Sequence, residues 1–139
     1  MRLSHLLRTG AVLAVTAAVA TLSTGTADAA VILTTWNATD TPADVVGAHA
    51  WGTLAPGPAL GTYVVDAQIK DTKSDSHGAR VNIRSACDGS CVSLVSVSAS
   101  GVDVTNTDDF TLKAPITVQE CLTEAGVDYI CGEPYKITP

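Results

Sequence analysis

Large and basic side chains are scarce in this sequence. Aromatic residues make up 4% of the chain, with one Phe and two Trp, and there is one Met. Eight Lys and Arg stand against fourteen Asp and Glu, so the formal net charge is −6. Because no segment concentrates positive charge, the composition argues against nucleic acid and anionic membrane as partners. The acidic balance is typical of a soluble protein.

No apolar run reaches the ~20 residues that a membrane-spanning helix needs. A basic start leads into the shorter apolar stretch Ala11–Leu22, and Ala27-Asp28-Ala29 supplies the small side chains that a signal peptidase reads. Residues 1–29 are therefore expected to be a secretory signal peptide that is cleaved before Ala30. The mature chain, residues 30–139, is expected to be a single domain, secreted in extracellular, soluble form without a membrane anchor.

Catalytic motifs are lacking as well. There is no Gly-x-Ser-x-Gly elbow, and His49 and His77 are interpreted as surface or turn histidines. A small hydrolase that uses Glu120, Glu124 or Glu133 stays an alternative, but a domain of this size leaves little room for a substrate cleft. We expect no enzyme, no catalytic residue, no metal site and no cofactor.

The four cysteines are Cys87, Cys91, Cys121 and Cys131. An even count in an exported chain predicts two disulfides, and three connectivities are possible. We favour Cys87–Cys91 and Cys121–Cys131, because each pair is local and flanks a turn-like segment. Neither spacing matches a common zinc site.

The residues that are present favour strands. Val, Thr, Ser, Ala and Gly dominate the mature chain, and Gly and Pro punctuate it about every 8 to 15 residues. We predict an all-β fold, an antiparallel β-sandwich of about seven to nine short strands with two local disulfides. The expected strands are residues 31–37, 48–54, 61–70, 79–86, 92–98, 102–105, 110–113, 116–122, 129–131 and 135–138. One helical turn is expected at residues 123–127.

The strongest strand signal predicts a hairpin of residues 61–70 and 79–86. Both runs alternate apolar and polar side chains with a period of two. A register with Ile69 beside Val81 would keep the apolar faces together and place Asp66 across from Arg84. The polar residues 71–78 between the runs are interpreted as a turn, with a calcium loop around Asp71 and Asp75 as the alternative.

The few aromatic residues have two possible roles. Core packing is expected for Tyr63, Phe110, Trp36 and Trp51, because a domain with so few large side chains needs them inside. Exposed on one sheet face, several of them would instead stack on sugar rings.

The loop closed by the second disulfide is the best candidate for a binding surface. A short cross-link lowers the entropy that a loop loses on binding. We therefore predict a contact surface made of Tyr129, Tyr135, Glu133 and Glu124. The alternative is that the disulfide only pins a hairpin near the chain end.

A stretch of the sequence resembles small secreted actinobacterial proteins of unknown function. The stretch is Val64-Val65-Asp66, then Asp71-Thr72, then Asp75 to Val81, together with the late cysteine pair. The resemblance implies a β-sandwich and no established activity. The chain is also similar to enediyne antibiotic apoproteins in size, acidity and disulfide number, but its closer-spaced cysteine pair comes first and their terminal strand motif is missing.

These observations predict a non-enzymatic secreted binding or surface-interaction protein. The expected partner is an extracellular protein or polysaccharide. An extracellular protease inhibitor with a disulfide-braced loop and a small-molecule carrier with a cleft between its sheets are the alternatives.

Overall fold

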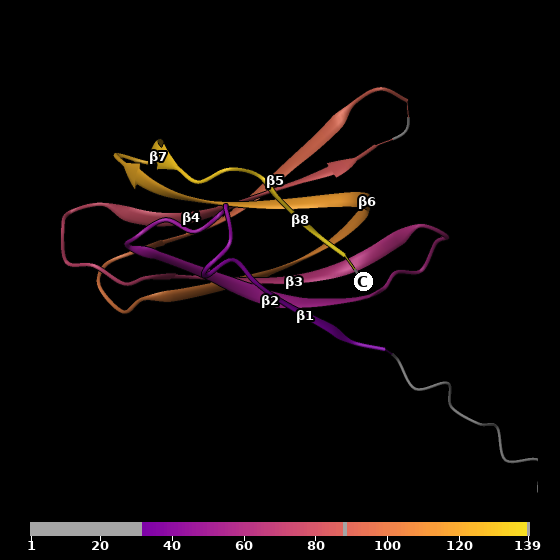
Figure 1. Cartoon of the computed structure of the whole chain (residues 1–139), viewed down its shortest axis with the longest axis horizontal. Helices are drawn as coiled ribbons and strands as arrows, with labels where there is room; N and C mark the ends of the chain where they lie inside the picture. The colour runs from indigo at the N-terminus through magenta and orange to yellow at the C-terminus, as the bar shows by residue number, and fades with distance from the viewer. Residues whose placement is uncertain (1–31, 88, 139) are drawn as a thin grey trace, which may run out of the picture.

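The computed structural model describes residues 32–87 and 89–138, and these form antiparallel strands with no helix (Figure 1). The predicted all-β antiparallel sandwich is confirmed. No segment in these two ranges is a helix long and apolar enough to cross a membrane. The signal peptide expected at residues 1–29 lies outside the described residues. The strands are β1 (Thr34–Asn37), β2 (Ala48–Pro56), β3 (Thr62–Asp71), β4 (Gly78–Ala86), β5 (Val92–Ser100), β6 (Thr105–Glu124), β7 (Val127–Cys131) and β8 (Tyr135–Ile137).

Strand β6 joins two packed layers. Its first half, up to Lys113, pairs with β3, and its second half, from Ile116, pairs with β4. Pro115 lies between the halves and has no backbone N–H, so the ladder is interrupted there. One layer is β1-β2-β3 with the first half of β6, and the other is β5-β4 with its second half. Strands β7 and β8 extend the second layer along the free edge of β6. Figure 1 shows the two layers with β6 turning from one into the other.

The core lies between the layers. Alternate side chains of β3 and β4 point into it, as the period-two pattern predicts. On β6, Ile116 and Val118 continue the same alternation. The fully buried apolar side chains of these three strands include Val65, Ala67, Ile69, Ala79, Val81, Ile83 and Val118.

The predicted β3–β4 hairpin is wrong. Ile69 pairs with Ala50 of β2 and Asn106 of β6, whereas Val81 pairs with Val97 and Glu120. The strands therefore belong to different layers and face each other across the core. Alternation specifies which face of a strand is dry, but not whether its apolar partner lies beside it or opposite it. The connection of residues 72–77 is also longer than the tight turns that join hairpin strands.

The same correction applies to the polar pair. Asp66 does not face Arg84; it pairs with Thr53 on one side and Asp109 on the other. Arg84 lies in the other layer, where it pairs with Leu94 and Thr117.

The helical turn predicted at residues 123–127 is also wrong. These residues form the end of β6, a two-residue turn and the start of β7. Ala125 and Gly126 have φ angles of 50° and 80°. Two successive positive φ angles are the signature of the type I′ hairpin turn, whose twist matches that of the strands it joins.

Both predicted disulfides are present. Cys87–Cys91 closes the β4–β5 connection with a Cα–Cα distance of 5.5 Å. Cys121–Cys131 links β6 to β7 with a Cα–Cα distance of 4.1 Å. The second bridge fixes the start of the hairpin that carries the candidate site.

Candidate functional site: the disulfide-linked hairpin

The β6–β7 hairpin holds two of the predicted contact residues, Glu124 and Tyr129. Cys121 pairs with Cys131, Leu122 with Ile130, and Thr123 with Asp128. The register shifts after Leu122, so Tyr129 is the extra residue of a β-bulge. A bulge increases the local twist and redirects the side chain that it carries.

A polar network docks this hairpin onto β4 of the same layer. Arg80 Nη1 donates to Asp128 Oδ1 at 2.9 Å, and Asn82 Nδ2 donates to Asp128 Oδ2 at 2.7 Å. Arg80 Nη2 also donates to the carbonyl oxygen of Gly126 at 2.9 Å. These charge-assisted bonds fix both oxygens of the Asp128 carboxylate. The hairpin is therefore held at its cysteine end by a covalent bond and at its turn by Arg80.

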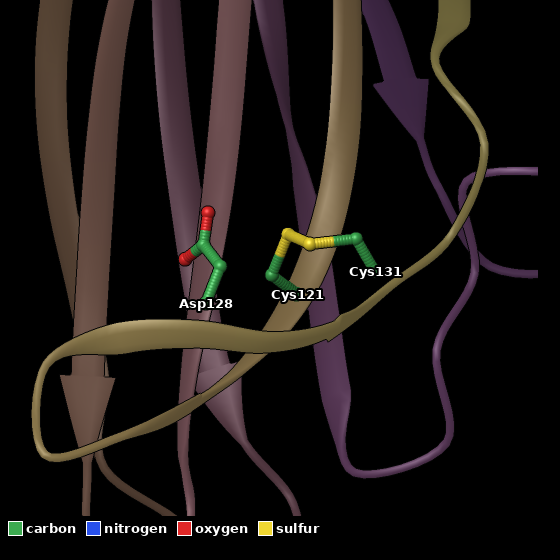
Figure 2. Close-up of side chains that lie close together, drawn as sticks. All are labelled: Cys121, Asp128 and Cys131. Atoms are coloured by element: carbon green, nitrogen blue, oxygen red, sulfur yellow. A yellow bond between two sulfur atoms is a disulfide. The ribbon is translucent and has the colours of Figure 1, made fainter.

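Asp128 also lies beside the disulfide, as Figure 2 shows. One ligand atom each from Cys121, Asp128 and Cys131 falls within 4.8 Å of the others. Metal binding by cysteine requires thiolates, and here the two sulfur atoms are bonded to each other. The Asp128 carboxylate is already hydrogen-bonded. The cluster in this oxidised state is thus a structural clamp and not a metal centre.

The outward side of β7 is apolar. Val127, Tyr129 and Ile130 are 68%, 58% and 49% exposed. Asp128 is the one charged residue of the strand, and its carboxylate is turned toward β4. Among the described residues β7 pairs on one edge only, with β6. Edge strands usually carry outward charges or prolines that block further pairing, and β7 has neither.

Tyr129 contacts the β3–β4 loop. Its ring stacks on His77 with a centroid distance of 5.2 Å and an interplanar angle of 16°. Asp75 Oδ1 accepts a hydrogen bond from the His77 backbone N–H at 3.2 Å and lies 3.4 Å from Nδ1 of its ring. The loop therefore supports the tyrosine from one side and leaves the other side open.

The remaining predicted residues are spread along the same edge of β6. Glu124 ends β6 beside the turn, and Glu133 follows β7, so two exposed carboxylates flank the strand. Glu133 donates its backbone N–H to the carbonyl oxygen of Pro42 at 2.7 Å. A Cβ on Gly132 would overlap the backbone of Ala43, so this close approach requires glycine.

Tyr135 does not share a surface with Tyr129. It lies on β8, pairs with Val118, and lines a hollow next to β1. Tyr129 instead contacts His77 at the turn end of the hairpin. Tyr129 thus lies on β7 with Glu124 and Glu133 near its two ends, whereas Tyr135 lies beside β1.

The residues proposed for calcium act within a turn. Asp71 is buried, and its carboxylate accepts hydrogen bonds from the backbone N–H groups of Lys73 at 3.1 Å and Gly101 at 3.0 Å. Both oxygens are thus used to join the β3–β4 loop to the β5–β6 loop. This arrangement favours the turn interpretation over a calcium loop.

The alternative hydrolase residues do not form one site. Glu120 lies inside the sandwich with 0% exposure, whereas Glu124 and Glu133 are exposed on the surface. His49 lines a hollow on β2, whereas His77 lines a polar hollow between loops. Within the described part of the chain, no serine hydroxyl is hydrogen-bonded to either histidine.

Sequence reasoning missed the residues that dock the hairpin. Arg80 and Asn82 were recognisable only as polar alternates of their strand, and Asp128 as one acidic residue between two cysteines. The 46 to 48 residues that separate these partners leave no local signal of contact. Glu120 did carry a signal, because the alternation from Ile116 to Leu122 places it on the dry face.

Comparison with known protein families, curated proteins and solved structures finds no match to this chain, so the resemblance to secreted actinobacterial proteins stays a prediction.

Proposed function

We propose that the chain is a non-enzymatic extracellular binding protein whose β7 edge captures an extended segment of another protein. One observation carries the proposal: the only charge on β7 is bound inward to Arg80 and Asn82, which leaves an apolar strand whose outer edge pairs with no other strand of the described residues. A strand of this kind offers backbone N–H and C=O groups to an added strand.

The rigidity of the hairpin supports this role. Flexible loops lose conformational entropy when they bind, and a preorganised loop avoids much of that loss. The Cys121–Cys131 bridge, the Arg80–Asp128 pair and the stack of Tyr129 on His77 hold β7 before any partner arrives.

Charge specifies the kind of segment. Glu124 and Glu133 flank β7, and the chain carries a net charge of −6. Complementary charges raise association rates and set the register of a bound segment. The expected partner segment is an apolar strand with basic residues at both ends.

Three labelled eight-residue peptides test the proposal. The first alternates Val and Thr between terminal Lys residues, the second carries Glu at the ends, and the third is the Lys peptide N-methylated at alternate backbone nitrogens. Fluorescence anisotropy with the oxidised protein should show binding of the first peptide, with at least tenfold weaker binding of the other two.

Two variants locate the contact. Ile130→Lys should weaken binding of the Lys peptide at least tenfold, because it adds a positive charge to the apolar edge and repels the basic peptide. Leu60→Lys is the matched control, since Leu60 is a fully exposed apolar residue in the β2–β3 loop. Equal affinity for the Lys peptide and the methylated peptide, or unchanged binding by Ile130→Lys, would contradict the proposal.

The protease-inhibitor alternative uses the same hairpin. An inhibitor would present β7 to the active-site cleft of an extracellular protease as the added strand. Titration against serine proteases and metalloproteases distinguishes the two roles, because only an inhibitor reduces turnover at a stoichiometric concentration.

A further inference from the structure

A second candidate site lies on the outer face of β1, β2 and β3. A hollow of about 500 Å³ opens there, and both tryptophans of the sequence, Trp36 and Trp51, line it. His49 lines it too, with its ring centroid 4.6 Å from that of Trp51. The volume falls within the range of small-molecule sites. This face belongs to the other layer from the one that carries β7.

One buried polar atom at this hollow has no partner. Nε2 of His49 is buried and bonds to no group in the described part of the chain. Trp36 pairs with Gly52 and packs over it on the core side of the layer, so its own indole N–H, unpaired among the described residues, does not face the hollow. Buried polar atoms usually find a partner, so the imidazole nitrogen of His49 indicates a place for a ligand hydroxyl.

Amide side chains add both donors and acceptors. Asn37 Oδ1 accepts from the backbone N–H of Thr39, and Gln68 Nε2 donates to Asp66 Oδ1. The amide NH₂ of Asn37 and the carbonyl oxygen of Gln68 are the groups that remain for a ligand within the described structure. Hydroxyl groups both donate and accept, and they can bond to each of these two groups.

The residues that line this hollow carry no formal charge when His49 is neutral. The site therefore favours a neutral ligand with one apolar face and several hydroxyls. A pyranose ring has this chemistry: its axial C–H groups stack on an aromatic ring while its hydroxyls reach the amides. A nucleobase could also stack on Trp51, but the net charge of −6 opposes a polyanionic strand.

A neighbouring hollow extends the site. Trp36, Thr35 and Asn37 also line a depression of about 230 Å³ on the other side of β1, together with Tyr135 of β8. The two hollows share these three residues, so a chain molecule can occupy both across β1. We infer that this face binds a neutral polysaccharide, with one sugar ring on Trp51 and a further unit beside Tyr135.

Native gels that contain a soluble polysaccharide test the inference. Separate gels would hold a β-1,3-glucan, an α-glucan, a soluble cellulose derivative, a mannan and a xylan, with alginate as the anionic control. Mobility should fall in at least one neutral gel and stay unchanged in alginate. Oligosaccharides of the retarding polymer should then change the tryptophan emission of the protein, with higher affinity for two or more units than for one.

Variants assign the effect to this face. Trp51→Ala should raise the dissociation constant of the oligosaccharide at least tenfold, Gln68→Ala should raise it several-fold, and Trp51→Phe should retain part of the affinity. Tyr129→Ala, an exposed aromatic in the other layer, is the matched control and should bind as the wild type does. Circular dichroism reports whether each variant is folded, and binding of the Lys peptide gives a second report for the variants of Trp51 and Gln68.

Several results would overturn the inference. The inference fails if the wild type migrates normally in every neutral gel. It also fails if Trp51→Ala, or a folded Gln68→Ala, is retarded as strongly as the wild type. Binding of oligothymidylate in place of any glycan would assign the face to nucleic acid. The peptide assay is independent, because retained peptide binding by Trp51→Ala leaves the hairpin proposal standing when the glycan site fails.

Discussion

Glu120 Oε1 accepts a hydrogen bond from the backbone N–H of Ala50 at 2.6 Å, inside the sandwich. Its second oxygen accepts one from Val45 at 2.9 Å. The side chain thus crosses from β6 to the segment that enters β2, and it ties the two layers together. A carboxylate in this position satisfies two backbone donors that would otherwise be buried without partners.

Stability should fall as the pH rises through the pKa of this carboxyl. Burial raises the pKa of Glu120 above its ordinary value of 4.5, and the nearby Asp44 carboxyl raises this pKa further. The two backbone hydrogen bonds lower the pKa, but they do not outweigh burial. The folded state therefore binds more protons than the unfolded state between the two pKa values. The contribution of this protonation to the free energy of unfolding is fully present below about pH 4.5 and is lost as the pH rises through the raised pKa of Glu120.

Glu120→Gln isolates this effect. Urea unfolding of both proteins should be measured from pH 4 to pH 7. The free energy of unfolding of the wild type, minus that of the variant, should decline as the pH rises. The amide keeps one acceptor for the loop but does not titrate. A constant difference across that range, or one that grows with pH, would contradict the assignment.

Asp128→Ala should release the hairpin from β4. The substitution removes two charge-assisted bonds and leaves the buried amide of Asn82 without its carboxylate partner. Because the Arg80–Asp128 pair is partly exposed, the expected loss is about 1–2 kcal/mol, and it should shrink at high salt. Urea unfolding measures it, and hydrogen exchange should quicken at Val127 and Ile130.

Asp103→Asn is the control for that experiment. Lys70 and Asp103 also form an ion pair at 2.7 Å, but Asp103 is largely exposed. Asn removes the charge and tolerates the positive φ of 64° at this position. Surface pairs of this kind contribute about 0–1 kcal/mol. A loss of stability in Asp103→Asn as large as that in Asp128→Ala would show that the contacts of Asp128 with β4 contribute no more than a surface ion pair.

The two disulfides should differ in what they do for binding. Chain-entropy arguments give about 3 kcal/mol for the Cys121–Cys131 ring and about 2 kcal/mol for the Cys87–Cys91 ring. Replacing either pair by Ala should therefore lower stability. Only loss of Cys121–Cys131 should weaken binding of the Lys peptide, because only that bridge fixes β7. The affinity measured by fluorescence anisotropy should fall at least tenfold. Equal effects on peptide affinity would remove preorganisation as the reason for the bridge.

Ala125→Asn should stabilise the hairpin turn. Ala125 has a φ of 50°, which an alanine adopts only at a cost, whereas Asn tolerates this conformation and Asn-Gly is a preferred type I′ pair. The expected gain is about 0.5–1 kcal/mol, by analogy with other turn substitutions that relieve strain. Thermal unfolding measures it, and Ala125→Val, which is β-branched, should change stability in the opposite direction.

The strand faces could be predicted from the sequence, but their neighbours could not. Alternation placed Val65, Ile69 and Val81 correctly in the core. It could not distinguish a partner in the same layer from one across the core, so β3 and β4 were predicted to pair. Pro115 indicated a strand end, whereas in the structure it marks the bend of a strand that continues in the other layer.

The candidate site was predictable in part for a similar reason. Exposure of Tyr129 follows from its place in a short loop between two cysteines. The inward turn of Asp128 depends on Arg80 and Asn82, which are distant in the sequence, and no local pattern encodes that contact. The division of Tyr129 and Tyr135 between two surfaces follows from the course of residues 132–134 past Ala43, which is likewise a tertiary property.

The shared strand β6 has a consequence for how this protein comes apart. In a sandwich built from two separate sheets, one sheet can slide or peel away while the other keeps its hydrogen bonds. Here one strand of twenty residues begins in one layer and ends in the other, so the backbone itself resists that separation. Melting should therefore proceed as one concerted transition, and a cut in the chain beside Pro115 should make unfolding less cooperative, because it divides the strand that the two layers share.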